Sequence, residues 1–119
     1  MNPNHQLGKQ GEQLAVDMLV DKGYTIKQRN YRYQKAEIDI IAQKQEIIAI
    51  VEVKSRSSEY WEEIAETVNQ KKISLLVMAA NQYVIDQELD VEIRFDIITV
   101  LQKGQKYQLE HLEDAYFHF

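Results

Sequence analysis

Residues 36–56 read AEIDIIAQKQEIIAIVEVKSR and contain two short runs that are rich in isoleucine and valine. Such runs, separated by polar residues, are typical of buried β-strands. Asp39, Glu52 and Lys54 lie inside the runs, although these residue types are rarely buried without partners. The stretch therefore predicts two neighbouring strands that bring charged side chains together.

The second strand changes character along its length. Side chains alternate between the two faces of a strand. One face carries Ile48, Ile50, Glu52, Lys54 and Arg56, and the other carries Ile47, Ala49, Val51 and Val53. The second face can pack on core throughout, whereas the first turns from apolar to charged. This pattern predicts a charged cleft at one end of a sheet.

The pairing of the two strands decides whether Asp39 and Glu52 meet. We consider first a hairpin that pairs Ala42 with Ile47. In this register Asp39 lies opposite Ile50, and Glu52 is its diagonal neighbour on the same face, about 7–8 Å away at the backbone. A register slipped by one residue, or a bulge, would put the carboxylates on opposite faces, and the sequence leaves this open.

A shared divalent cation would explain two facing carboxylates. Without one they repel each other and one takes up a proton. Both could bind a magnesium ion at about 2.1 Å, with manganese as a substitute. Lys54 could orient or deprotonate a water and stabilise charge on a phosphate, which together describes phosphodiester hydrolysis. A Glu52–Lys54 ion pair with Asp39 in a turn is the structural alternative, and spacing alone favours neither.

Length and composition predict one soluble domain, residues 1–119, in the cytoplasm. The chain has 119 residues, 45% hydrophobic and 28% charged, and no cysteine. It contains no apolar run of the roughly 20 residues that a membrane span needs, so no membrane partner is expected. The net charge of −5 argues against coating nucleic acid through bulk charge, so any such binding must be local.

The order of elements predicts an α/β fold with a central mixed sheet flanked by helices. Apolar spacing predicts a first helix that stops at Gly23 and a second helical stretch that could break near Asn69. The expected elements are a helix at 8–22, a strand at 24–29, a turn region NYRYQK at 30–35, the two strands described above, helix at 59–85, and strands at 91–101 and 107–112.

The chain contains Asp39, then twelve residues, and then Glu52-Val53-Lys54. This arrangement resembles the motif of the PD-(D/E)XK nuclease superfamily. More closely, the chain resembles the bacterial YraN family of predicted endonucleases, which are similar to archaeal Holliday junction resolvases. The resemblance covers nearly the whole chain and rests on Gly8, Gly11-Glu12, Ala15, Gly23-Tyr24, Arg29-Asn30, Arg32, Glu37-Ile38-Asp39, Ile41-Ala42, Val51 to Lys54, Arg56, Val68, Lys72 and Arg94-Phe95-Asp96. Ala36 departs from the pattern, because a glycine usually stands there.

The resemblance implies a restriction-endonuclease-like fold in the order helix, three antiparallel strands, helix and further strands. It also implies that Asp39 and Glu52 bind the metal, that Lys54 assists catalysis, and that Glu12 completes the site. The implied activity is a magnesium-dependent endonuclease acting on branched or damaged DNA in repair or recombination, with a homodimer as the expected assembly. The alternative is a nucleic-acid-binding or protein-interaction module that does not cleave.

Further candidate residues lie outside the two central strands. Glu12 falls at the edge of the apolar stripe of the first helix, where small glycines would let it approach the sheet; a solvated side chain is its structural alternative. Lys72 lies on the inward stripe of the second helix and could contact a phosphate or the site; snorkelling to solvent is its structural alternative. Arg29, Arg32 and Arg56 are predicted to bind nucleic acid, since arginine suits phosphates, and scattered solvated charges are the structural alternative.

One charged pair and the three histidines have no predicted role in the site. Arg94 and Asp96 share one strand face and predict an ion pair or cap. His5, His111 and His118 lack metal-ligand spacing, and no role is assigned to them.

Overall fold

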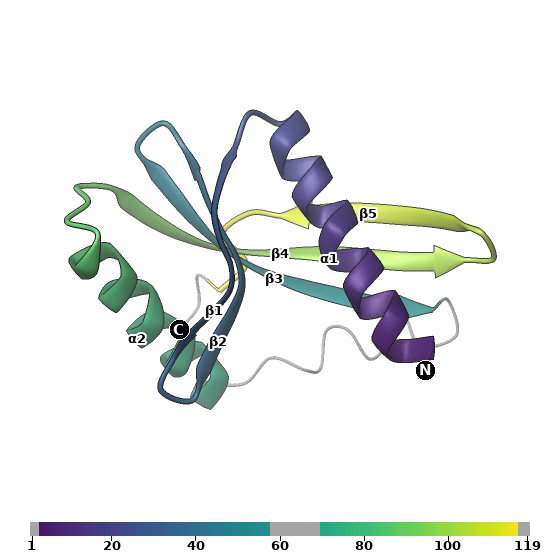
Figure 1. The fold of residues 1–119 in the computed structure, drawn as a ribbon, viewed down its shortest axis with the longest axis horizontal. Coiled ribbons are helices and arrows are strands. Elements are labelled where there is room, and N and C mark those ends of the chain that lie inside the picture. The colour runs from purple at the N-terminus through teal and green to yellow at the C-terminus, as the bar shows by residue number, and fades with distance from the viewer. Residues whose placement is uncertain (1–2, 58–69, 117–119) are drawn as a thin grey trace.

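The computed structural model describes residues 3–57 and 70–116, which form two helices and five strands (Figure 1). The elements are α1 (Pro3–Asp21), β1 (Thr25–Tyr33), β2 (Ala36–Lys44), β3 (Ile47–Ser57), α2 (Gln70–Asp86), β4 (Glu92–Lys103) and β5 (Lys106–Leu112). Within these ranges the strands form one sheet in the order β1-β2-β3-β4-β5. Neighbours are antiparallel except for the parallel pair β3 and β4. The predicted α/β class and order of elements are therefore confirmed.

The helices cover opposite faces of the sheet (Figure 1). The α1-side core comprises Ala15, Val16, Leu19, Tyr24, Ile40, Ala42, Ala49, Val51, Ile98 and Val100. The α2-side core comprises Ala36, Ile38, Ile41, Ile48, Ile50, Ile73, Leu76, Ala79, Ala80, Tyr83 and Tyr116. Alternation along β3 divides its apolar side chains between the two cores, as the sequence pattern predicts. Neither described helix combines the length and the apolar character that a membrane crossing requires.

Helix α1 ends in a Schellman motif at Gly23. The N–H of Tyr24 donates to Leu19 O and the N–H of Gly23 donates to Val20 O, both at 3.0 Å. Gly23 has a φ of 95°, a conformation that glycine adopts without steric cost. The predicted helix stop at Gly23 is confirmed.

Two boundaries within the described residues differ from the prediction by more than two residues. Helix α1 begins at Pro3 and not at Gly8. Strand β1 continues to Tyr33 through most of the region predicted as a turn, because Tyr31 and Tyr33 pack against the α2-side core. Tyr33 pairs with Ala36, so only the two residues between them form the turn. Helix α2 begins at Gln70, and the predicted helical residues 59–69 lie outside the described residues.

The β2–β3 hairpin is tighter than the register considered first. Lys44 pairs with Ile47 and Ala42 pairs with Ala49, so β3 is shifted by two residues relative to the prediction. A shift of two preserves which side chains share a face, whereas a shift of one would have reversed it. Extending this register would bring Asp39 opposite Glu52, but the pairing ends at Ile40 and Val51.

Close packing of α1 on β3 predicts different effects of alanine at two glycines. A Cβ at Gly11 would lie 1.9 Å from Ser55 Oγ and 3.0 Å from its Cβ, whereas none lies within 4 Å at Gly8. Gly8→Ala should raise the free energy of unfolding by about 0.5–1 kcal/mol through helix propensity. Gly11→Ala should instead lower it by about 1 kcal/mol or more through overpacking. Denaturant unfolding measures both, and equal stabilisation by the two changes would contradict this packing.

Candidate functional site

A buried carboxylate, Glu52 on β3, lies at the centre of a group of donors on the α2 face of the sheet. Glu52 is 9% exposed. Its Oε1 accepts from Lys54 Nζ at 2.9 Å and also from Lys72 Nζ. The hydroxyl of Tyr116 donates to Oε2 at 2.7 Å. We call Glu52, Lys54, Lys72 and Tyr116 the Glu52 cluster.

The donors keep Glu52 ionised in spite of its burial. Burial alone would raise the pKa of Glu52, but the hydrogen bonds from Lys72, Lys54 and Tyr116 outweigh it and hold the pKa below its ordinary value. Burial lowers the pKa of Lys54, against the attraction of Glu52. The Lys54 side chain is 8% exposed and that of Lys72 is 39% exposed, so Lys72 is the ammonium group that solvent or a ligand can reach.

Asp39 lies where β2 separates from β3. Beyond the last pair, Ile40 and Val51, the N–H of Val53 donates to Asp39 Oδ2 at 2.8 Å. The carboxylate thus satisfies a backbone group that the hairpin no longer pairs. Ile38 packs in the α2-side core and Ile40 in the α1-side core, so the regular alternation of β2 is interrupted at Asp39.

Two cavities meet at Asp39. The smaller, of about 310 Å³, is lined by Asp39, Glu52 and Lys72, together with Lys35, Ala36, Glu37, Leu75 and Leu76. The larger, of about 1140 Å³, lies between α1 and the strands, and Glu37 and Asp39 line it as well. Asp39 and Glu52 therefore share one cavity despite the interrupted alternation.

The residues predicted to bind nucleic acid are divided between the cavities and the surface. Arg29 and Arg56 line the larger cavity, and Lys72 lines the smaller one. Arg32 lines neither, because it is exposed and forms an ion pair with Glu37 at 3.2 Å. Lys9 on α1 also lines the larger cavity and was not among the predicted residues.

Glu12 joins α1 to β1. Its Oε1 accepts from Arg29 Nε at 3.2 Å and from Asn30 Nδ2 at 3.1 Å. Glu12 lines the larger cavity with Asp39, whereas Glu52 does not. In the part of the chain that the structure describes, no three or more His, Asp or Glu side chains are grouped so as to hold a metal ion. The structure does not bring Glu12, Asp39 and Glu52 into one such group.

The two remaining carboxylates fit a magnesium ion chemically. Magnesium prefers oxygen ligands and is usually bound by one or two carboxylates together with waters and substrate phosphates. Asp39 and Glu52 provide that number of carboxylates on one cavity. The pKa of Asp39 is raised to about 6. Burial is the largest cause and the negative charges of Glu52, Glu12 and Glu37 add to it, whereas the hydrogen bond from the Val53 N–H lowers the pKa. A cation would relieve this repulsion.

The interruption near Asp39 does not require a glycine at position 36. Ala36 is buried in the α2-side core and pairs with Tyr33 across the turn. The left-handed conformation falls two residues earlier, on Gln34 with a φ of 55°. Ala36 therefore occupies ordinary strand backbone, and its departure from the family pattern costs no backbone strain there.

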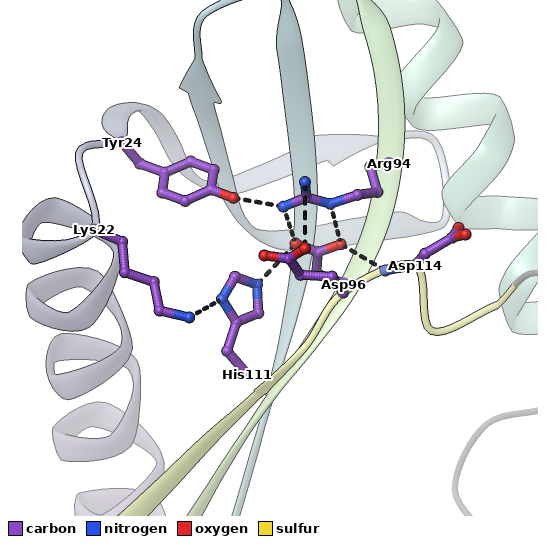
Figure 2. Close-up of polar contacts among 7 residues, drawn as sticks. Lys22, Tyr24, Arg94, Asp96, His111 and Asp114 are labelled. Atoms are coloured by element: carbon purple, nitrogen blue, oxygen red, sulfur yellow. Dashed lines mark hydrogen bonds and ion pairs between the residues drawn. The ribbon is translucent and has the colours of Figure 1, made fainter.

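A second charged group lies on the α1 face, around Asp96 of β4 (Figure 2). Asp96 has no exposed surface and accepts from Arg94 Nε at 2.9 Å and Arg94 Nη2 at 2.8 Å. His111 Nε2 lies 2.8 Å from Asp96 Oδ2, and the N–H of Asp114 donates to Oδ1 at 3.1 Å. The predicted Arg94–Asp96 ion pair is confirmed. We call Lys22, Tyr24, Arg94, Asp96, His111 and Asp114 the Asp96 cluster.

Sequence reasoning missed His111 and Tyr116. Lys22 Nζ lies 2.8 Å from His111 Nδ1, and since an ammonium group can only donate, His111 Nε2 carries the proton donated to Asp96. Figure 2 shows His111 between α1 and β4 in this role. Both residues reach partners far away in the chain, so local spacing carried no signal for them. Only the alternation of β5, which puts His111 on the same face as Tyr107 and Leu109, could have indicated the α1 side.

These features define an α/β protein whose mixed sheet carries a buried, hydrogen-bonded glutamate and a second carboxylate on one cavity. Residues 11–100 match the profile of the uncharacterised protein family UPF0102. The chain belongs to this family, which supports the resemblance to the YraN family.

Relatives cover the full length of the chain. A UPF0102 protein of Flavobacterium psychrophilum is 52% identical over 119 residues, with 100% of both chains covered. A UPF0102 protein of Christiangramia forsetii is 46% identical with the same coverage. One of Bacteroides thetaiotaomicron is 39% identical, covering 98% of this chain and 97% of the relative.

The raised pKa of Asp39 predicts how stability changes with pH. Unfolded aspartate titrates near pH 3.9, about two units below folded Asp39. Folded Asp39 therefore binds more proton than unfolded Asp39 between about pH 4 and 6, and its contribution to the free energy of unfolding falls as pH rises through this window. Asp39→Asn should remove this contribution and stabilise metal-free protein by on the order of 2 kcal/mol at about pH 7.5.

Thermal and denaturant unfolding across this pH range provide the test. Asp90→Asn is the matched control, because Asp90 is exposed and lines neither cavity. The control should keep the wild-type dependence on pH. An Asp39→Asn curve that runs parallel to the wild-type curve from about pH 4 to 6 would show that Asp39 does not make this contribution.

Proposed function

We propose that this chain is a metal-dependent endonuclease that hydrolyses phosphodiester bonds in DNA, on a fold of the PD-(D/E)XK, restriction-endonuclease-like class. One observation carries the proposal: Asp39 and Glu52 line the same cavity, and Lys54 is hydrogen bonded to Glu52. Two carboxylates and a lysine in this relation match the motif that the sequence presents.

Asp39 and Glu52 would hold the ion, with magnesium expected and manganese as a substitute. When bound, such an ion supplies a Lewis acid and lowers the pKa of a coordinated water. Asp39 is already oriented by the Val53 N–H, and Glu52 by the Tyr116 hydroxyl. Fixed orientation of both carboxylates favours the preorganisation that catalysis needs.

The two lysines of the Glu52 cluster are suited to different tasks. Lys72 is the more exposed and lines the cavity, so it can move from Glu52 to a phosphate and stabilise its negative charge. Lys54 is buried against Glu52, and its lowered pKa suits a group that exchanges a proton with an attacking water. These roles agree with those expected of Lys54 and Lys72 from the sequence.

The larger cavity offers a path for the DNA backbone toward Asp39. Lys9, Arg29 and Arg56 line it, and such side chains bind phosphates without reading sequence. Because the whole chain carries a net charge of −5, this local group of cations has to provide the attraction. Branched or damaged DNA as substrate, and a homodimer that cuts two strands symmetrically, are the finer parts of the proposal and follow from the resemblance alone.

One observation favours the alternative of a module that binds nucleic acid without cleaving it. The charge of Glu52 is already balanced by two ammonium groups, Lys54 and Lys72. A carboxylate in this state is stable without a metal ion. Cleavage therefore requires an ion to compete with at least one lysine for Glu52, whereas binding alone does not.

Metal-dependent cleavage assays test the proposal. Wild type, Asp39→Asn and Glu52→Gln are incubated with branched and linear duplexes in magnesium or manganese. We expect cleavage by the wild type and a loss of more than roughly 100-fold in both variants, since a bound ion supplies several kcal/mol of transition-state stabilisation. Glu92→Gln, an exposed position on β4 outside both cavities, should retain wild-type activity.

The outcomes separate the two functions. Binding of branched DNA that is unaffected by either site variant, with no cleavage by any protein, would support the binding module. Cleavage that survives both Asp39→Asn and Glu52→Gln would reject this pair of carboxylates as the catalytic site.

A further inference from the structure

The segment that follows β5 is fixed to β4 at two backbone positions. The N–H of Asp114 donates to Asp96 Oδ1 at 3.1 Å, and the N–H of Ala115 donates to Phe95 O at 2.7 Å. Figure 2 shows the contact between Asp114 and Asp96. The segment then delivers Tyr116, which is 6% exposed, into the α2-side core. Its hydroxyl thereby reaches Glu52 on the α2 face of the sheet, whereas Asp96 lies on the α1 face.

Tyr116 differs in kind from the other donors to Glu52. Its phenol is uncharged, so it orients the carboxylate without repelling a cation. The ammonium groups of Lys54 and Lys72 also orient the carboxylate, but they repel a cation. A phenol hydroxyl is protonated at neutral pH, so Tyr116 contacts Glu52 as a hydrogen-bond donor.

The two oxygens of Glu52 are not equally occupied. Oε1 accepts from Lys54 and Lys72, while Oε2 accepts from Tyr116. A carboxylate oxygen has two acceptor positions. Among residues 3–57 and 70–116, Tyr116 is therefore the uncharged donor that holds Glu52 by the oxygen that the two lysines do not contact.

We propose that Tyr116 is a positioning residue for divalent metal binding, holding the Glu52 carboxylate through Oε2 in the orientation in which it meets an ion shared with Asp39. The inference rests on the proposed metal site and assigns to the C-terminal segment a function beyond packing. Donors to metal-bound carboxylates orient their ligands, and losing one typically weakens metal binding by about 10–100-fold.

A rival role gives the opposite sign. If Tyr116 instead blocked Oε2, its hydroxyl would compete with the ion, and removing it would tighten metal binding. A purely structural role would change stability and leave the affinity for metal unaltered. The sign of the change in affinity therefore distinguishes the three roles.

Manganese binding to Tyr116→Phe tests the proposal without reference to activity. Calorimetric titration of wild type and variant should show affinity for Mn²⁺ weakened by roughly tenfold or more in the variant. Tyr107→Phe is the matched control, because it removes a hydroxyl that donates to Gln10 Oε1 at the same 2.7 Å, far from Glu52 in an exposed contact. The control should bind Mn²⁺ like the wild type.

Several results would overturn the inference. Unchanged or tighter Mn²⁺ binding by folded Tyr116→Phe, with binding by the wild type intact, would contradict it and leave the proposed function standing. A wild type that binds no Mn²⁺ would instead reject the proposed metal site, and the inference with it.

A measurement on the wild type covers the case in which Tyr116→Phe does not fold. The hydroxyl proton of Tyr116, followed by NMR during titration with diamagnetic Mg²⁺, should stay protected from exchange at saturation. Loss of its protection on Mg²⁺ binding would mean that the ion displaces the hydroxyl, which contradicts a positioning role.

Discussion

A glutamate can remain ionised inside a packed sheet face only if hydrogen-bond donors surround it, and Glu52 meets this condition through Lys54, Lys72 and Tyr116. These three donors come from β3, α2 and the segment after β5. The buried charge therefore ties together parts of the chain that the backbone pairing of the sheet does not connect. Removing one donor would leave part of a buried charge without compensation, which is far more costly than losing an exposed ion pair.

The two buried acids of the sheet lie on opposite faces and are linked through β3 and β4. Val51 pairs with Asp96 in the parallel register, so Glu52 is one residue away from the strand position beside Asp96. The Asp96 cluster fixes Asp114 on one face, and the same segment then delivers Tyr116 to Glu52 on the other. Burial alone would raise the pKa of Asp96, but hydrogen bonds from His111, Arg94 and the Asp114 N–H hold it below its ordinary value. The Asp96 carboxylate therefore stays charged at neutral pH.

Local patterns predicted the parts of the molecule that depend on short sequence separation. Alternation along residues 47–56 correctly placed Glu52 and Lys54 on one face of β3, and Gly23 correctly marked the end of α1. The register of the β2–β3 hairpin was wrong by two residues, because its turn is tighter than spacing could reveal. The interruption at Asp39, and the contacts of Tyr116 and His111, depend on partners that only the folded sheet brings near, so no local pattern could predict them.

We propose that Asp39 and Glu52 bind one divalent ion in the cavity that they share. Anomalous diffraction from crystals of the wild-type protein soaked in manganese would show such an ion directly. We expect one strong anomalous peak within coordination distance, about 2.0–2.2 Å, of an oxygen from each carboxylate, with Lys72 moved away from Glu52. Well-diffracting crystals in which Lys54 and Lys72 still contact Glu52, with no peak between the two acids at saturating manganese, would contradict it.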